Sequence, residues 1–198
     1  MHLRCIHPPQ VDEGSELSYR LIMDIRLAQE TDLNSILKVI ETAFSDEENK
    51  VIMNFVQELS RETTSPSIKS LVAEVDNQVI GYVSYSPIYL KSDSSIVGYI
   101  LAPLAVSPEH QKQGVGSNLI NAGIEMLTKD GVGVLMVYGD PAYYGRFGFK
   151  EEIGCSFVPP YTLQYPFGWT GMMLNDIPVP EQPIQFECVS ALSKPDLW

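Results

Sequence analysis

The sequence predicts a mixed α/β fold of the α+β class. Its 198 residues are 44% hydrophobic and 19% charged, which is typical of a globular protein. The spacing of apolar residues predicts, in order, a strand, two helices, three antiparallel strands, a helix, a strand, a short helix and late strands. We expect residues 23–198 to form a single domain. Residues 1–22 lack sustained periodicity, and we expect a loosely ordered N-terminal extension there.

A short strand and two helices are expected first. Ile25 and Leu27 alternate with polar neighbours, as in a half-buried strand. In residues 30–44, and again in residues 47–62, apolar side chains recur at intervals of three and four. This spacing predicts two helices with one buried stripe each. Thr31 is expected to cap the first helix.

Three strands follow these helices. Residues 67–90 predict two strands joined by a two-residue turn at Asp76 and Asn77. Residues 95–108 predict a third strand, whose apolar run is typical of the centre of a sheet. Pro103 interrupts this strand. Because proline lacks the N–H that a central strand needs, we expect a bulge or bend there and a splayed C-terminal half.

The second half of the chain predicts a helix, a buried strand and a short helix. Apolar residues after Pro108 are spaced as in an amphipathic helix that ends near Gly131. Residues 131–139 predict a buried strand, and residues 140–149 a short helix capped by Asp140. The late strands are expected at residues 171–176 and 184–192.

Charge and cysteine content exclude several classes of function. The net charge is −12 and the 13 lysines and arginines form no cluster, which argues against a nucleic-acid partner. No stretch reaches the ~20 apolar residues of a membrane span, so no membrane partner is expected. Cys5, Cys155 and Cys188 show no metal-ligand spacing, and we expect no metal. Unpaired cysteines favour a reducing compartment, so we expect a cytoplasmic protein.

The stretch QKQGVGSNL, residues 111–119, lies where a strand gives way to a helix. It lacks the Lys-Ser or Lys-Thr pair of a Walker loop, and Leu119 stands where a dinucleotide fingerprint has its third glycine. Glycines here could let main-chain N–H groups converge on a diphosphate at the positive end of the helix. They would equally suit a tight turn packed against the strand.

The stretch LAPLAVSPEHQKQGVGSNLINAGIEML, residues 101–127, resembles the coenzyme A binding motif of the GNAT superfamily of N-acetyltransferases. Gln111, Gly114 and Gly116 occupy its Gln/Arg-x-x-Gly-x-Gly/Ala positions. VYGDPAYYGRFGF, residues 137–149, resembles the second signature of that superfamily in its YhbS-like form. The resemblance implies a V-shaped, mixed but mostly antiparallel sheet with helices on both faces. It also implies acetyl-coenzyme A as the co-substrate.

The resemblance further implies the residues of the site. The main chain of Leu104, Ala105 and Val106 would line the pantetheine arm. The diphosphate would be held by Gln111, Lys112, Gln113, Gly114, Val115, Gly116 and Ser117. Tyr144 would act as the general acid, because a phenol is protonated at neutral pH and can donate to a departing thiolate.

The base that would deprotonate the amine is left open. Candidates are Glu74, Tyr99, Asp140 and a chain of water molecules. Among neighbouring residues, Tyr143 is expected to pack and His110 to be solvated. Arg146 could reach a phosphate but is expected to pair on the surface.

The implied activity is transfer of an acetyl group from acetyl-coenzyme A to a primary amine of a small molecule or peptide. The negative net charge favours a cationic acceptor. Two other interpretations stand beside it. A non-catalytic module that binds coenzyme A or an acyl group fits the missing base and the aromatic segment at residues 157–169. An acyl carrier protein could also replace coenzyme A as the donor. A homodimer is possible.

Overall fold

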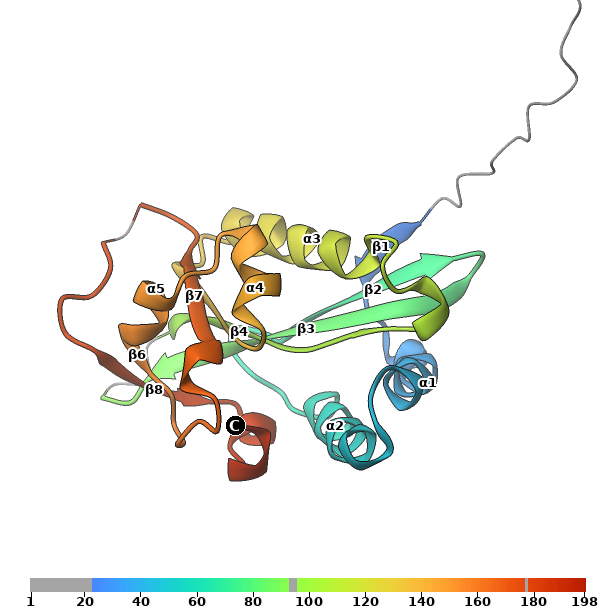
Figure 1. The fold of residues 1–198 in the computed structure, drawn as a ribbon, viewed down its shortest axis with the longest axis horizontal. Helices are drawn as coiled ribbons and strands as arrows, with labels where there is room; N and C mark the ends of the chain where they lie inside the picture. The colour runs from blue at the N-terminus through green and yellow to red at the C-terminus, as the bar shows by residue number, and fades with distance from the viewer. Residues whose placement is uncertain (1–22, 93–95, 177) are drawn as a thin grey trace, which may run out of the picture.

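The computed structural model describes residues 23–92, 96–176 and 178–198, and the expected N-terminal extension lies outside them. The chain forms a mixed sheet with helices on both faces, as predicted (Figure 1). The strands are β1 (Asp24–Leu27), β2 (Lys69–Val75), β3 (Gln78–Leu90), β4 (Ile96–Val106), β5 (Val134–Tyr138), β6 (Phe157–Val158), β7 (Trp169–Met173) and β8 (Ile184–Cys188). The helices are α1 (Leu33–Ala43), α2 (Asp46–Leu59), α3 (Val115–Lys129), α4 (Pro141–Tyr144) and α5 (Glu151–Cys155).

The main path of the sheet runs β1-β2-β3-β4-β5-β7, and only the β4–β5 pair within it is parallel. The predicted hairpin between β2 and β3 turns at Asp76 and Asn77, with φ of +50° and +61°. Two positive φ values match the turn whose twist suits a two-residue hairpin. The short strand β6 and helix α5 were not predicted, because neither is long enough to show a hydrophobic period.

Apolar cores fill both faces of the sheet. The buried stripes of α1 and α2 pack on one face through Ile40, Phe55 and Val56. The stripe of α3, with Leu119 and Ile120, packs on the other. Figure 1 shows α3 above the sheet and α1 and α2 below it. The predicted helical periods therefore correspond to the faces that the helices bury.

The C-terminal segment returns to α2. β8 pairs with the end of β3, and the Glu62 carboxylate, just beyond α2, accepts hydrogen bonds from the N–H groups of Ser190 and Ala191 at 2.6 and 2.9 Å. β7 begins two residues earlier than predicted, because Trp169 pairs with Tyr138 at the end of β5. These contacts fasten the end of the chain against the α1 and α2 side of the sheet.

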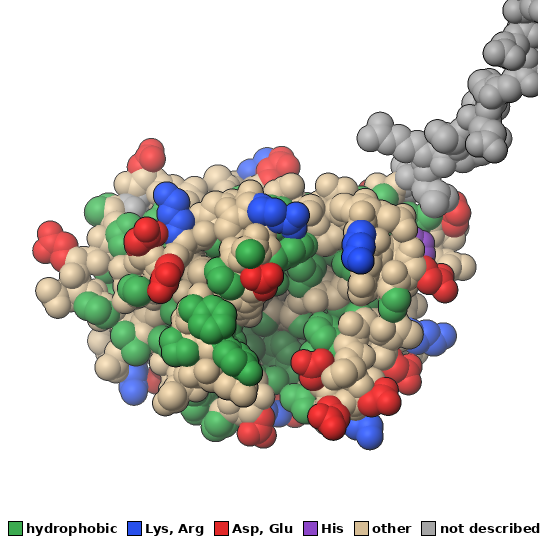
Figure 2. All heavy atoms as spheres, in the orientation of Figure 1, with side chains coloured by type: hydrophobic (Ala, Val, Ile, Leu, Met, Phe, Trp, Pro, Cys, Tyr) green, Lys and Arg blue, Asp and Glu red, His purple; other side chains and the backbone are tan. Residues whose placement is uncertain are grey.

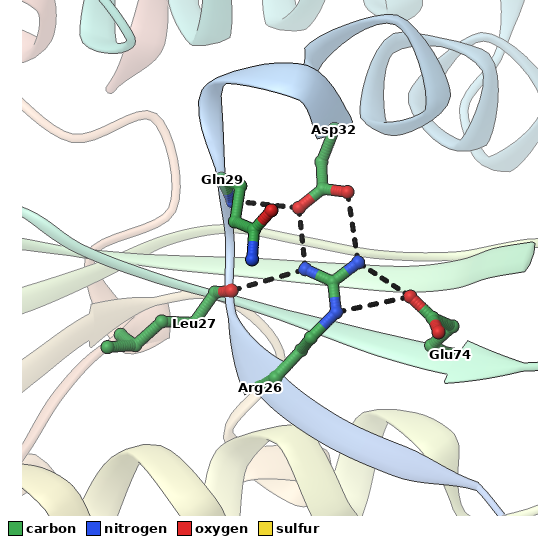
Figure 3. A network of polar contacts seen from close by, with 5 residues as sticks. All are labelled: Arg26, Leu27, Gln29, Asp32 and Glu74. Carbon is green, nitrogen blue, oxygen red and sulfur yellow. Dashed lines mark hydrogen bonds and ion pairs between the residues drawn. The ribbon is translucent and has the colours of Figure 1, made fainter. Parts of the chain in front are cut away.

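A carboxylate other than the predicted cap organises the start of α1. Asp32, and not Thr31, accepts a hydrogen bond from the N–H of Gln29 at 2.7 Å. The Arg26 guanidinium on β1 donates two bonds to Asp32, at 2.7 and 3.0 Å, and two to Glu74 on β2 (Figure 3). Hydrogen bonding to Arg26 lowers the pKa of Asp32. The network joins two strands to the first helix.

Replacing Arg26 should destabilise the fold in a pH-dependent way. Arg26→Met should lower the free energy of unfolding at pH 7 by about 2 kcal/mol, because it leaves two partly buried carboxylates unpaired. The pKa of Asp32 is depressed in the folded state, so the contribution of the pair is present above about pH 4 and is lost as the pH falls below it. Urea denaturation at pH 7 and pH 3 measures both effects.

Lys129→Met provides a matched control for that experiment. Lys129 pairs with Glu125 on the exposed face of α3, where such a pair contributes about 0.5 kcal/mol or less. An equal loss in the two variants at pH 7, or an Arg26→Met loss that persists unchanged at pH 3, would contradict the assigned role.

Candidate functional site

The site begins where β4 and β5 separate. They pair only from Tyr99 to Leu101, although β4 continues to Val106. Ala102 and Pro103 lie opposite the single residue Ser84 of β3, so β4 carries the bulge expected at Pro103. The predicted splay is therefore present.

Beyond the bulge, part of the main chain of β4 faces the space that opens between β4 and β5. The Ser107 N–H donates to the Ile80 carbonyl at 2.9 Å, which fixes the phase of the β3–β4 ladder. Because hydrogen-bonded pairs alternate along antiparallel strands, Leu104 and Val106 direct their N–H and C=O groups away from β3. Ala105, between them, is buried with its main chain toward β3.

The loop after β4 has an uncommon backbone. Gly114 has φ +87°, which explains the glycine, but Lys112 has φ +60° without being one. A lysine in the left-handed region costs free energy that surrounding contacts must offset. The side-chain amide of Gln111 donates to the Val106 carbonyl at 3.0 Å, and that of Gln113 donates to the Glu109 carbonyl at 2.8 Å. Positive φ at alternate positions is the geometry from which anion-binding nests are built.

The N-terminus of α3 follows directly. The first intrahelical bond runs from the Asn118 N–H to the Gly114 carbonyl at 2.9 Å, so the N–H groups of Val115, Gly116 and Ser117 have no acceptor within the helix. Gly114 provides no capping side chain, and the first turn contains no acidic residue. This end of α3 can therefore accept an anion.

A cavity of about 650 Å³ opens at this helix end. The predicted residues that line it are Leu104, Val106, Gln111, Lys112, Gly114, Val115, Gly116 and Ser117. Ala105 and Gln113, also predicted, do not line it, because one is buried and the other turns its side chain toward Glu109. Figure 2 shows a hollow in this face with apolar side chains inside it. Basic side chains lie above it together with some acidic ones, and acidic side chains are densest beside it over α1 and α2.

The two sequence motifs meet at Gly116. A Cβ on Gly116 would lie 2.8 Å from the Tyr143 hydroxyl, so glycine leaves room here for the Tyr143 side chain to approach α3 closely. Asp140 caps α4 as predicted, accepting from the Ala142 N–H at 2.9 Å. Tyr143 packs on Phe147 and Tyr144, as expected, and it also lines the cavity.

Tyr144 lies beside the cavity rather than in its lining. Its ring packs edge-on against Tyr143 at 5.1 Å and against Phe149 at 5.8 Å. Burial raises the pKa of Tyr144, and the nearby Tyr143 and Asp140 raise it further. Within the described part of the chain, its hydroxyl forms no hydrogen bond. The group is therefore a protonated, unengaged phenol, while its catalytic role stays a prediction.

Two residues that were expected to be ordinary surface groups also face the cavity. Arg146 was expected to pair with an acid, but its guanidinium lies over the rings of Tyr143 and Phe147, with centroid distances of 4.5 and 5.6 Å. His110 was expected to be solvated, but its Nδ1 is buried and has no hydrogen-bond partner among the described residues. Sequence reasoning noted that Arg146 could reach a phosphate but assigned neither residue to the site, since neither position has a periodic or spacing signal.

The structure also restricts the choice of base. Glu74 lies on β2, two strands from β4, and is bound by Arg26 of β1. The Tyr99 hydroxyl donates to the Ser67 carbonyl at 3.0 Å. Asp140 is engaged as the cap of α4. Each of the three side chains therefore has a structural partner.

In the residues that the structure describes, no group of three or more His, Cys, Asp or Glu side chains is placed to hold a metal ion. The same residues contain no helix with the length and hydropathy needed to cross a membrane.

The fold is a mixed sheet whose strands β4 and β5 separate, with the open N-terminus of α3 next to the point of separation. Comparisons with known proteins identify the family that has this arrangement. Residues 24–151 match the family model of the GNAT acetyltransferase domain. The uncharacterized N-acetyltransferase YjhQ of Escherichia coli K12 is 32% identical over 140 residues, covering 69% of this chain and 75% of YjhQ. The uncharacterized N-acetyltransferase YhbS of the same organism is 33% identical over 130 residues, 65% and 74% of the two chains.

Solved structures agree with the sequence relatives. E. coli YhbS in complex with coenzyme A has a TM-score of 0.75 at 24% identity and covers 88% of this chain and 93% of its own. A GNAT acetyltransferase of Brucella melitensis in complex with acetyl-coenzyme A has a TM-score of 0.61 at 27% identity, with coverage of 86% and 98%. The chain belongs to the GNAT acetyltransferase family and is an acyltransferase.

Tyr144 should remain protonated beyond pH 10. In an absorbance titration of phenolate, the difference between the wild type and Tyr144→Phe should have its midpoint above the ordinary tyrosine pKa of about 10. Above that pH the unfolded chain loses this proton before the folded protein does, so the wild type should lose stability with rising pH more steeply than the variant. A difference curve centred at or below pH 10 would contradict the assignment.

Proposed function

We propose that this protein transfers an acetyl group from acetyl-coenzyme A to a primary amine. One observation carries the proposal: the open N-terminus of α3 and the part of β4 that is no longer paired with β5 border the same cavity. Membership of the GNAT family supports acyl transfer. The relatives from E. coli and Brucella that were solved with coenzyme A and acetyl-coenzyme A support the choice of donor.

In this proposal the two parts of the donor meet different parts of the site. The diphosphate lies against the N–H groups from Gln113 to Ser117, where the dipole of α3 favours negative charge. Lys112 adds a cation at the same end. The pantetheine arm lies along β4, where Leu104 and Val106 offer main-chain groups and Ala105 holds the strand to β3.

Transfer then proceeds by direct attack. The protonated amine first loses a proton to water or to the base left unassigned above. Its nitrogen then bonds to the thioester carbonyl carbon, and the carbonyl oxygen becomes an oxyanion that the Leu104 N–H would stabilise. When the C–S bond breaks, the departing thiolate takes the phenol proton of Tyr144. The nitrogen loses its second proton to the same acceptor, and a proton from solvent restores the Tyr144 phenol. The products are an amide and the coenzyme A thiol.

A cationic acceptor fits the opposite side of the site. Figure 2 shows that acidic side chains are densest over α1 and α2 beside the hollow, whereas the basic side chains near the hollow lie above it, together with some acidic ones. A hollow with this charge distribution would attract an anionic donor and a protonated amine to different sides. An amine that carries no further negative charge is therefore the proposed acceptor class.

Replacing Tyr144 should separate binding from turnover. Tyr144→Phe should bind acetyl-coenzyme A with unchanged affinity in titration calorimetry. It should release thiol about 10²-fold more slowly or worse with a reactive amine, because the departing thiolate has lost its proton donor. Tyr89→Phe is a matched control, since that hydroxyl donates to the Ser65 carbonyl at the far end of β3.

The same assays decide among the alternatives. Failure of the wild type to bind acetyl-coenzyme A at millimolar concentration would overturn the proposal and favour a carrier-protein donor. Replacing acetyl-coenzyme A with an acyl carrier protein in the same assay would test that alternative. Binding without thiol release across an amine panel would favour a non-catalytic sensor. Unchanged turnover in Tyr144→Phe would remove Tyr144 from the reaction.

A further inference from the structure

Arg146 is a charged group that the proposed mechanism does not use. It lies after α4, in the short turn Gly145–Phe147, and its side chain lines the cavity at the N-terminus of α3. The guanidinium rests on the ring of Tyr143 and near that of Phe147, and its Nε donates to the Tyr143 carbonyl at 3.2 Å. The side chain is thus held in one place.

This arginine has no acidic partner among the residues with described positions. Arg26, Lys69, Lys129 and Lys194 all form ion pairs with acidic side chains. Other described basic side chains, such as Arg61 and Lys150, also form no ion pair, but the Arg146 guanidinium is held against two aromatic rings. Nε is engaged, but both terminal nitrogens keep their N–H groups for another acceptor.

Tyr143 links this cation to the first motif. Its hydroxyl lies against Gly116 in the first turn of α3, and its ring supports Arg146. The guanidinium therefore lines the same cavity as the open N–H groups of α3. A planar guanidinium whose Nη1–Nη2 edge is free is suited to bidentate contact with a phosphate.

We propose that Arg146 binds a phosphate group of the acyl donor and that Tyr143 is the positioning residue that holds it there. The inference rests on the proposed function, because the phosphate is that of coenzyme A. Its consequence is donor specificity: a donor that lacks the phosphates would gain nothing from Arg146.

Three ligands and one substitution test this inference. Titration calorimetry of the full chain measures the affinities of coenzyme A, 3′-dephospho-coenzyme A and pantetheine. Arg146→Gln should weaken coenzyme A binding about 10-fold to 100-fold and leave pantetheine binding unchanged. An equal loss for dephospho-coenzyme A assigns the contact to the diphosphate, whereas no loss for that ligand assigns it to the 3′-phosphate.

Two controls exclude indirect effects. Lys150→Gln removes the same charge from a nearby exposed position and should change no affinity. Tyr143→Phe keeps the ring and should retain most of the affinity. Tyr143→Leu should weaken coenzyme A binding in the wild-type background but not when Arg146 is already glutamine. A purely structural role would instead lower the melting temperature and weaken all three ligands alike.

The outcomes distinguish this inference from the proposed function. If the wild type binds coenzyme A and Arg146→Gln binds it equally well, the role of Arg146 is overturned and the proposed function stands. If the wild type binds none of the three ligands, both are overturned.

Discussion

The site depends on one interruption in the sheet. Parallel pairing between β4 and β5 stops at Leu101, while β4 continues beside β3 to Val106. Proline has no N–H to donate to a ladder, and β4 bulges at Ala102 and Pro103, just beyond its last pair with β5. The main chain that is released there, together with the helix that starts beyond it, forms the wall against which a donor can lie.

The second constraint is the contact between α3 and the turn that follows β5. Gly116 leaves room for the Tyr143 hydroxyl, and the ring of Tyr143 carries the guanidinium of Arg146. One small residue therefore brings a phenol and a cation to the helix end that carries the open N–H groups. In an acidic protein, such local placement is how an anion can be held against the overall field.

The opposite side of the sheet is organised by different interactions. Arg26 joins β1, β2 and the start of α1, while Glu62 fastens the C-terminal segment next to α2. These contacts fix the α1 and α2 side of the sheet, and neither Arg26 nor Glu62 lines the cavity at the N-terminus of α3.

The sequence by itself determined the order of elements, the bulge at Pro103, the turn at Asp76 and Asn77, and the cap at Asp140, because periodicity and turn chemistry are local properties. Of the ten residues predicted from the motif to bind coenzyme A, eight line the cavity. Only the tertiary structure showed that Lys112 adopts a positive φ, that Asp32 replaces Thr31 at the first helix, and that Arg146 rests on Tyr143. The residues in these contacts are close together in the sequence, but their conformations depend on packing against distant elements. Arg26 on β1 holds Asp32 beside Glu74 of β2, and Tyr143 lies against Gly116 of α3. Such packing leaves no spacing signal in the sequence.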